Sequence, residues 1–295
     1  MSATAAIILA GGGSTRMGTA KAALQWRGST LLRRAVGIAG RAVDGPVVVV
    51  RARGQELPPL PAGIDVAEDE RAGRGPLQGI AAGLQAVGAR ARDAYICGVD
   101  SPLTHPAFIR HVVRSLGADH DVALPSAHGF DHPLAAAYRI ASVAPEIEQL
   151  LAGDELRTRA LMARLHVRKL DAAALLADPA VAVLDPRLDS LLNVNTPEQY
   201  AAARARPAPA VTVLCAGALR VRGLDPVTLC VATVGAAAGI LDIALGGDVV
   251  AMINGERIVE DPQEPLAAGD AVIFMAPERA GPERLASSRI TRTPW

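Results

Sequence analysis

Aromatic residues and cysteines are scarce in this sequence of 295 residues. Phe, Trp and Tyr make up 3% of the chain, so the core that its 50% of hydrophobic residues can build must consist of Ala, Val, Leu and Ile. The three cysteines, Cys97, Cys215 and Cys230, are too few and too scattered for a disulfide framework or a metal site. Because all three lie in apolar runs, we expect buried thiols in a reducing compartment.

An excess of charge and long apolar runs are also missing. Lys and Arg number 30, as do Asp and Glu, and this balance gives no indication of a nucleic-acid or membrane-surface partner. The longest uncharged run, Val227–Leu241, is shorter than the roughly 20 apolar residues of a membrane helix. The N-terminus has no basic region of the kind that begins a signal peptide. We therefore expect a soluble, cytoplasmic protein, with two domains or one large one.

One stretch of the sequence, Ala5–Lys21, indicates a ligand. Its apolar start predicts a strand, Ala6–Leu9, which runs into the glycines Gly11–Gly13. Glycines let the backbone turn sharply and approach a ligand closely, and exposed N–H groups before a helix bind anions. Arg16 and Lys21 add two cations, so the stretch predicts a polyphosphate site. The alternative is a glycine-rich turn with surface cations.

This glycine loop differs from the two common phosphate-binding motifs. A P-loop requires Ser or Thr after its Lys, but Ala22 follows Lys21, and a dinucleotide fingerprint requires Gly where Arg16 stands. Instead, residues 9–21 read LAGGGSTRMGTAK and match every fixed position of L-A-G-G-x-S-x-R-M-G-x-x-K. In this signature the chain resembles the molybdenum cofactor guanylyltransferases and, more widely, the NTP transferases.

Strand and helix patterns alternate through the first 205 residues. Continuous apolar runs at Val47–Val50 and Ala94–Val99 indicate strands buried on both faces of a sheet, and Thr30–Ala42 has helical spacing. This alternation predicts an α/β fold. The resemblance implies a three-layer, Rossmann-like nucleotidyltransferase domain with a mostly parallel sheet over residues 1–205. We expect a last strand at Val181–Leu184.

Asp100 stands directly after the predicted strand Ala94–Val99. Ligands of open α/β sheets bind at the carboxyl ends of the strands, and a carboxylate beside a polyphosphate typically holds Mg²⁺. A turn or helix-capping role is the alternative, but Asp100-Ser101-Pro102 matches the Asp-x-Pro motif of the family and favours the metal. We therefore expect Mg²⁺ as cofactor, with Asp100, Arg16 and Lys21 as catalytic residues.

Further site residues are implied by the resemblance alone. It assigns the acidic residue Asp69 and the segment GPLQG, Gly75–Gly79, to the nucleotide, and it assigns Asp131-His132-Pro133 and Asn193–Pro197 to the acceptor. Each assignment has a structural alternative. Asp69 would be part of the solvated surface, the GPLQG segment would be a turn that caps a helix, and the asparagines would cap backbone groups. The expected nucleotide-binding residues are Leu9, Ala10, Gly11, Gly12, Gly13, Lys21, Asp69, Gly75, Pro76, Leu77, Gly79 and Asp100. The expected acceptor-binding residues are His132, Asn193 and Asn195.

The reaction that the resemblance implies is transfer of GMP from GTP to the phosphate of molybdopterin, with release of pyrophosphate. The nucleophile is already an anion, so catalysis requires alignment and charge neutralisation rather than a general base. The L-A-G-G motif accompanies guanine in this family, which favours GTP over CTP. The alternatives are transfer to another phosphorylated small molecule, and a non-catalytic cofactor-binding or scaffold protein.

The composition changes at residues 206–210, a short Pro/Ala linker at which we place a domain boundary. Residues 211–281 resemble the ubiquitin-like β-grasp sulfur carriers of molybdopterin and thiamine synthesis, which implies a small α+β domain. Its expected elements are a hairpin of Val211–Leu214 with Thr228–Val231, a helix at Val234–Leu245, and strands at Val249–Ile253 and Ala271–Met275. Asn254-Gly255 is a strong type I′ turn signal.

The end of the second domain departs from those carriers. They act through a free C-terminal Gly-Gly, whereas this chain has Arg279-Ala280-Gly281 and continues to Trp295. Either the chain is cleaved after Gly281 or the domain no longer carries sulfur. In the second case we expect the domain to dock other proteins of molybdenum cofactor synthesis, and residues 282–295 to form a disordered tail.

Overall fold

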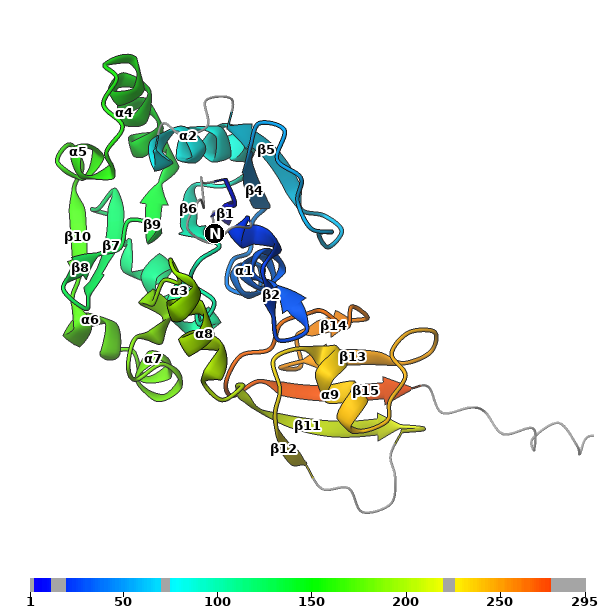
Figure 1. Ribbon diagram of the computed structural model, residues 1–295. Helices are drawn as coiled ribbons and strands as arrows, with labels where there is room; N and C mark the ends of the chain where they lie inside the picture. Colours follow the sequence, from blue (N-terminus) through cyan, green and yellow to red (C-terminus); the bar gives the residue numbers. More distant parts are fainter. Residues whose placement is uncertain (1–2, 12–19, 70–74, 220–225, 277–295) are drawn as a thin grey trace, which may run out of the picture.

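An eight-stranded sheet organises the N-terminal part of the chain in the computed structural model, which describes residues 3–11, 20–69, 75–219 and 226–276 (Figure 1). Its strands are β1 (Thr4–Leu9), β4 (Val47–Ala52), β5 (Asp65–Asp69), β6 (Asp93–Gly98), β7 (Val122–Ala127), β8 (Phe130–Asp131), β9 (Ala135–Arg139) and β10 (Val167–Leu170). The order is β10-β7-β9-β6-β1-β4-β5, with β8 paired to β7. Strand β9 is antiparallel to both neighbours, and the other neighbours on this path are parallel.

Helices cover both faces of this sheet, because successive strand residues point to opposite sides. In β1, Ala6 and Ile8 enter one core, while Ala5 and Ile7 enter the other. The first core is closed by α1 (Leu31–Gly40), α3 (Pro106–Ser115), α6 (Ala172–Leu176) and α7 (Pro179–Leu184). The second is closed by α2 (Pro76–Val87), α4 (Ile140–Ala152) and α5 (Thr158–Met162). The three layers confirm the predicted Rossmann-like α/β fold with a mostly parallel sheet.

The strand predicted at Val181–Leu184 is wrong, because these residues belong to the helix α7. The Oδ1 atom of Asp178 caps this helix by accepting from the N–H groups of Ala180 and Val181, at 2.9 and 3.1 Å. Pro179 occupies the first helical position, which its fixed φ favours. A short apolar run is compatible with either element, and here the cap decides for the helix. The edge strand next to β7 is β10.

A five-stranded sheet organises the C-terminal part. Its strands are β11 (Ala210–Gly217), β12 (Val227–Cys230), β13 (Val250–Ile253), β14 (Arg257–Val259) and β15 (Ala271–Ala276), in the order β12-β11-β15-β13-β14. The central pair β11 and β15 is parallel, and the other pairs are antiparallel. Helix α9 (Val234–Ile240) packs on the sheet and ends five residues before the predicted Leu245. We call residues 3–205 the N-terminal unit and residues 210–276 the C-terminal unit.

Two predictions for the C-terminal unit have opposite outcomes. Asn254 and Gly255 have φ values of 55° and 73°, so the turn predicted after β13 is confirmed. The burial predicted for all three cysteines is confirmed for Cys97 in the N-terminal unit, but Cys215 is only half-buried and Cys230 is exposed. Cys230 ends β12, an edge strand whose alternate residues face solvent, and an apolar run in sequence does not reveal this.

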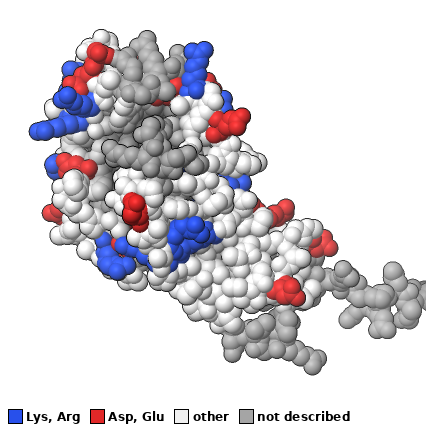
Figure 2. All heavy atoms as spheres, viewed as in Figure 1, with Lys and Arg blue, Asp and Glu red and all other residues white. Residues whose placement is uncertain are grey.

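The remaining described elements are short or link the others. They are a two-stranded hairpin of β2 (Gln25–Trp26) and β3 (Ser29–Thr30), the 3₁₀ helices η2 (Lys21–Ala23), η3 (Gly88–Arg90) and η4 (Asp189–Leu191), and the helix α8 (Pro197–Ala205). Among the helices that the structure describes, none combines the length and apolar character that crossing a bilayer requires. On the face that Figure 2 shows, basic and acidic side chains of the N-terminal unit are interspersed, in keeping with the balanced charge.

The two units meet where α1 packs against the loop of residues 261–270. A Cβ on Gly37 would lie 2.5 Å from Cγ and Cδ of Pro265, so the absence of a side chain allows this close approach. Arg41 pairs with Asp270, and the two side chains are only 8% and 5% exposed. The C-terminal unit is thus joined to α1 by buried contacts as well as by the chain.

Candidate active site

The parallel strands bring several of the predicted site residues to one edge of the first sheet. Leu9, the last residue of β1, is in register with Gly98, the last residue of β6. Asp69 ends β5 at the same edge, because β1, β4 and β5 run parallel. The segments that follow β1 and β6, with Gly11 and Asp100, therefore leave the sheet on the same side, as predicted.

Lys21, Asp100 and Asn195 meet at this edge. The Nζ atom of Lys21 lies 3.2 Å from Oδ2 of Asp100 and donates a hydrogen bond of 2.7 Å to Oδ1 of Asn195. Lys21 begins η2, Asp100 follows β6 and Asn195 precedes α8, so three segments far apart in the sequence converge. The side chains of Lys21 and Asp100 are 19% and 25% exposed, so a ligand can reach the pair.

Gly98 leaves space for the carboxylate of Asp100. A Cβ at position 98 would lie 2.6 Å from Oδ1 of Asp100, closer than a carbon atom and a non-bonded oxygen atom approach each other. The neighbouring Cys97 is unsuited to act as a nucleophile, because burial and, secondarily, the charge of Asp100 raise the pKa of its thiol to about 12. The polar chemistry at the end of β6 is therefore that of Asp100.

The glycine turn before α2 lies close to the end of β1. Gly75 has a φ of +81°, which glycine adopts without strain, and Pro76 begins α2. A Cβ on Gly79 would lie 3.4 Å from Cδ2 of Leu9 and 4.0 Å from Oδ2 of Asp69. The structure thus brings Gly79 next to Leu9 and Asp69, so that three of the residues predicted for the nucleotide lie together, one turn of α2 from Gly75 and Pro76.

Two other residues predicted for the nucleotide are engaged with the protein itself. Leu77 is fully buried and packs in the core beneath α2. Ala10 donates its N–H to the carbonyl of Val50 at 2.8 Å and accepts from Nε2 of Gln55 at 3.1 Å. Leu77 and Ala10 therefore stabilise the site's walls. The contribution of Gln55 was not predicted, because Gly54–Gly63 shows only the composition of a loop.

The asparagines predicted for the acceptor hold the segments that carry Lys21 and Asp100. Oδ1 of Asn193 accepts from Oγ of Ser101 at 2.7 Å, next to Asp100, and Asn195 accepts from Lys21. The N–H of Val194 donates to the carbonyl of Asp100 at 2.8 Å. This segment therefore runs alongside the loop that follows β6 and fixes it.

The same motif also begins α8, as its sequence predicts. Oγ1 of Thr196 accepts from the N–H of Gln199 at 3.3 Å, and Oε1 of Gln199 accepts from the N–H of Asn195 at 2.8 Å. This arrangement is a variant of the capping box in which Gln199 reaches the residue before the N-cap Thr196, and Pro197 takes the first helical position. The cap and the contact of Asn195 with Lys21 exist together, so the two interpretations of this motif do not exclude each other.

His132 lies between β8 and β9, at the same end of the sheet, but apart from Lys21, Asp100 and Asn195, which we call the lysine cluster. Its Nε2 lies 3.1 Å from the carbonyl of Ala127, and burial lowers the pKa of its imidazole, so the ring is neutral at pH 7 and donates through Nε2. Among the residues that the structure describes, no hydrogen bond or ion pair joins His132 to Lys21, Asp100 or Asn195.

Part of the predicted phosphate loop, with Gly12, Gly13 and Arg16, lies outside the described residues, and its role stays a prediction. Within residues 3–11, 20–69, 75–219 and 226–276, no cluster of three His, Cys, Asp or Glu side chains could hold a metal ion. A metal beside Asp100 would thus take most of its ligands from phosphate oxygens and water, a set that suits Mg²⁺.

Comparison with known proteins relates the N-terminal unit to nucleotidyltransferases. Residues 6–170 match the family described as MobA-like NTP transferase domain. A probable molybdenum cofactor guanylyltransferase of Mycobacterium ulcerans is 42% identical over 161 residues, which cover 53% of this chain and 78% of the relative. A protein of the same description from Mycobacterium avium is 39% identical over 196 residues, which cover 65% and 90%.

Solved structures share the fold of the N-terminal unit. Molybdopterin-guanine dinucleotide biosynthesis protein A from Archaeoglobus fulgidus has a TM-score of 0.54 and 22% identity, over 68% of this chain and 96% of that one. 2-C-methyl-D-erythritol 4-phosphate cytidylyltransferase from Thermus thermophilus has a TM-score of 0.50 and 18% identity, over 70% of this chain and 98% of that one. Such low identities establish the fold and leave the substrate open.

Proposed function

The chain belongs to the MobA-like NTP transferase family, and we propose that it transfers GMP from GTP to the terminal phosphate of molybdopterin and releases pyrophosphate. The descriptions of its Mycobacterium relatives support a guanylyl group as the group transferred and the molybdenum cofactor as its acceptor. The observation that carries the proposal is the contact of Lys21 with Asp100 and Asn195 at the carboxyl edge of the sheet, where α/β proteins bind nucleotides.

In the proposed reaction, an oxygen of the molybdopterin phosphate forms a bond to the α-phosphorus of GTP. The bond from that phosphorus to the oxygen that bridges to the β-phosphate breaks, and pyrophosphate leaves with the electron pair. The attacking phosphate is an anion at neutral pH, so no side chain has to remove a proton. The protein contributes alignment of the two phosphates and stabilisation of the charge on the leaving group.

Lys21 supplies positive charge next to the reacting phosphates. Its contacts with Asp100 and Asn195 hold the ammonium group before a substrate binds, which lowers the cost of organising the site. The N–H of Gly11 donates to the carbonyl of Val50 at 3.2 Å, so Arg16 and the N–H groups of Gly12 and Gly13 would add the further positive charge. These groups together would hold the triphosphate and stabilise the departing pyrophosphate.

We propose Mg²⁺ as the cofactor and Asp100 as its protein ligand. Oδ2 of Asp100 contacts Lys21, and Oδ1, over Gly98, accepts no hydrogen bond from the described residues, which suits a carboxylate that binds a cation. When bound, Mg²⁺ would neutralise charge on the phosphate oxygens. Lys21, which contacts Oδ2 of the same carboxylate, would add positive charge to the phosphates.

The nucleotide and the acceptor would bind on opposite sides of Lys21. The neighbourhood of Gly79, with Asp69 and Gly75, would contact the guanine nucleoside, and His132 and Asn193 would contact the acceptor. The contacts of Asn193 and Asn195 within the protein add a positioning role to the acceptor role predicted for them. Because GTP is available in the cytoplasm, we propose that the enzyme works there.

For the C-terminal unit we propose a ubiquitin-like β-grasp domain, with boundaries at residues 211 and 281 and a linker at 206–210. The order of its five strands, second-first-fifth-third-fourth, its parallel central pair and its single described helix support this assignment. The segment Arg279–Gly281 and the tail 282–295 lie outside the described residues. We propose that this domain docks other proteins of molybdenum cofactor synthesis.

The proposal is tested by measuring pyrophosphate release with GTP, CTP and ATP in the presence of Mg²⁺, each with and without molybdopterin. The expected result is release that requires both GTP and molybdopterin. Thermal-shift measurements with the same nucleotides report binding separately, because a ligand of the folded state raises Tm. Release with a sugar phosphate in place of molybdopterin would overturn the assignment of the acceptor, and a preference for CTP would overturn that of the nucleotide.

A further inference from the structure

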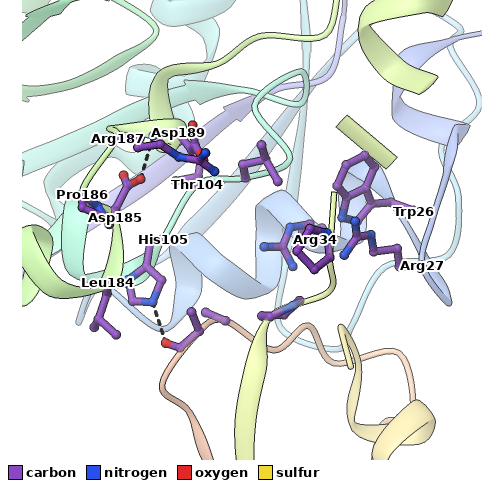
Figure 3. Close-up of a pocket in the computed structure, with 15 residues that line it drawn as sticks. Trp26, Arg27, Arg34, Thr104, His105, Leu184, Asp185, Pro186, Arg187 and Asp189 are labelled. Carbon is purple, nitrogen blue, oxygen red and sulfur yellow. Dashed lines mark hydrogen bonds and ion pairs between the residues drawn. The ribbon is translucent and has the colours of Figure 1, made fainter. Parts of the chain in front are cut away.

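A cavity of about 230 Å³ lies at the junction of the two units (Figure 3), and neither Lys21 nor Asp100 lines it. The N-terminal unit contributes Arg27, Arg34 and His105 to its wall, the linker contributes Pro207, and the C-terminal unit contributes Ala268. It is large enough for a small organic or inorganic ligand, since cavities of about 150 Å³ in other proteins hold a benzene molecule.

Arg34 is a buried cation in this wall without a carboxylate partner. Its side chain donates from Nε to the carbonyl of Pro102 and from Nη1 to that of Leu266, the latter at 3.2 Å. The residue is 7% exposed, and burial lowers the pKa of its guanidinium to about 10. Asp270 pairs with Arg41 rather than with Arg34. The positive charge of Arg34 is therefore desolvated and only partly compensated.

Arg27 adds a second cation on the same side of the cavity. It stacks on Trp26 and donates to the carbonyls of Arg204, at 3.1 Å, and Arg206. Burial, assisted by the charge of Arg204, lowers the pKa of its guanidinium. In the described part of the chain, no carboxylate lies within ion-pair distance of Arg27 or Arg34.

The two acidic residues that line the cavity, Asp185 and Asp189, lie across it from Arg27 and Arg34, and both already have partners in the protein (Figure 3). Asp189 pairs with Arg187, at 3.1 Å, and with Arg206. Asp185 accepts from the N–H groups of Asp189 and Ser190, at 2.7 and 3.2 Å. The excess of charge that a ligand could neutralise is thus positive.

We propose that this junction cavity binds a small oxyanion, either a carboxylate or a phosphate compound, between Arg27 and Arg34. The planar guanidinium groups match the paired oxygens of both classes. His105 is neutral here, because its Nδ1 accepts from the N–H of Ala107 and its Nε2 donates to the carbonyl of Ala268. It therefore shapes the cavity without adding charge.

The same three segments form the lysine cluster and the wall of this cavity. The segment that begins with Lys21 reaches the cavity at Trp26, and the one that begins with Asp100 reaches it at Leu103–His105. The third segment leaves the cavity at Asp189 and leads to Asn195. A ligand bound here would contact all three segments.

The test is isothermal titration of the full chain with inorganic phosphate and, separately, with succinate, which distinguishes the two ligand classes. The Lys21→Met variant is used throughout, so that binding at the phosphate loop is weakened. We expect saturable binding of at least one of the two anions. Arg27→Gln and Arg34→Gln, each combined with Lys21→Met, should weaken it about tenfold or more, the effect of losing one charged hydrogen bond.

Arg168→Gln is the matched control, because Arg168 also donates to a backbone carbonyl, that of Ser115, but lies on β10. It should leave the affinity unchanged. Arg27 is only half-buried, so we expect Arg27→Gln to fold. If Arg34→Gln does not fold, the affinity of the Arg27→Gln variant for the anion tests the proposal. The absence of binding by both anions, or equal affinity with and without Arg27, overturns the proposal. These titrations use no turnover, so their outcome is independent of the proposed guanylyl transfer.

Discussion

The side chain of Lys21 donates a hydrogen bond of 2.7 Å to Asn195, a residue 174 positions away in the sequence. The same ammonium group lies 3.2 Å from the carboxylate of Asp100. One amide oxygen and one carboxylate thus hold a cation at the edge of the sheet where the phosphates of a nucleotide would bind. This arrangement assigns Asn195 a role in positioning Lys21.

Asn195→Ala should lower kcat for pyrophosphate release about tenfold, the cost of one positioning hydrogen bond worth roughly 1.5 kcal/mol. The comparison variant is Asn193→Ala, which removes the contact with Ser101 and the proposed acceptor contact but leaves Lys21 held, so it should raise KM for molybdopterin more than it lowers kcat. Steady-state kinetics with varied molybdopterin separates the two roles of Asn195. A rise in KM for molybdopterin with unchanged kcat would show that Asn195 contacts the acceptor and does not position the lysine.

Lys21→Met should lower kcat/KM by about 10²–10³-fold, the range seen when one preorganised donor to a developing charge is removed. Its effect on folding should be small, because an ion pair accessible to solvent contributes about 0–1 kcal/mol. Pyrophosphate release and urea unfolding of the same preparation measure both quantities. Retention of more than a tenth of the activity would exclude Lys21 from the catalytic residues.

Gly98→Ala should lower kcat about 100-fold by displacing Asp100, since misplacement of a catalytic group by about 1 Å costs that much. The added Cβ would otherwise lie 2.6 Å from Oδ1 of Asp100. Gly40→Ala is the control, because its Cβ would lie 3.5 Å from Cγ2 of Val47, an ordinary contact. The activity and its dependence on Mg²⁺ concentration are measured for both. Wild-type activity of Gly98→Ala would show that the position of Asp100 is not critical.

The approach of Lys21 to Asp100 could be predicted from the sequence, but the contribution of Asn195 could not. Both Lys21 and Asp100 follow strands whose apolar pattern indicates a parallel sheet, and the carboxyl ends of such strands share one edge. The segment of Asn195 carries only a helix-start signal, and that signal is correct. Nothing local to it indicates which distant residue its side chain meets.

Arg41→Met should lower the free energy of unfolding by about 3–5 kcal/mol, because it leaves the buried charge of Asp270 without its ion-pair partner. Hydrogen bonds from Asn254 and from the N–H of Ala267 remain, but they do not neutralise that charge. Arg187→Ala is the control, since the side chain of Arg187 is 74% exposed and its pair with Asp189 should contribute about 0–1 kcal/mol. Urea unfolding measures both variants. Equal, small effects would show that the junction contributes little to stability.

The junction itself was not predictable from the helical pattern of α1. Its Arg33 and Arg34 are 9% and 7% exposed, although arginines on an amphipathic helix usually face water. They are buried because Arg33 pairs with Asp261 and Arg34 bonds to Leu266, residues 228 and 232 positions further along the chain. Periodicity indicates which face of a helix is apolar, but it carries no information about a second unit that covers its charged side.

Lowering the pH below about 6.5 should destabilise the junction through His105. Burial, which disfavours the charged imidazolium, lowers the pKa of His105 below its ordinary value of 6.5. The neutral ring is also the form in which Nδ1 can accept from the N–H of Ala107. At pH values between the pKa of His105 in the folded protein and that in the unfolded chain, the unfolded chain binds more protons than the folded protein. The free energy of unfolding therefore falls as the pH falls through this range. This contribution is fully present above pH 6.5.

The matched variant is His105→Asn, which retains a side chain that can cap α3 but does not titrate. Urea unfolding of both proteins at pH 7.5 and 5.5 measures the effect. The loss of stability on acidification should be smaller in His105→Asn, while His132, whose pKa is also lowered, contributes equally to both proteins. The same loss in the two proteins would contradict the role of His105.

The central claim, guanylyl transfer to molybdopterin at the lysine cluster, is tested most directly by mass spectrometry of the product made from GTP, molybdopterin and Mg²⁺. The structure and the family predict molybdopterin guanine dinucleotide and one equivalent of pyrophosphate with the wild-type chain, and neither at a comparable rate with Lys21→Met. Formation of a cytosine dinucleotide in preference to the guanine one, or a guanylyl product formed with a sugar phosphate but not with molybdopterin, would contradict the claim.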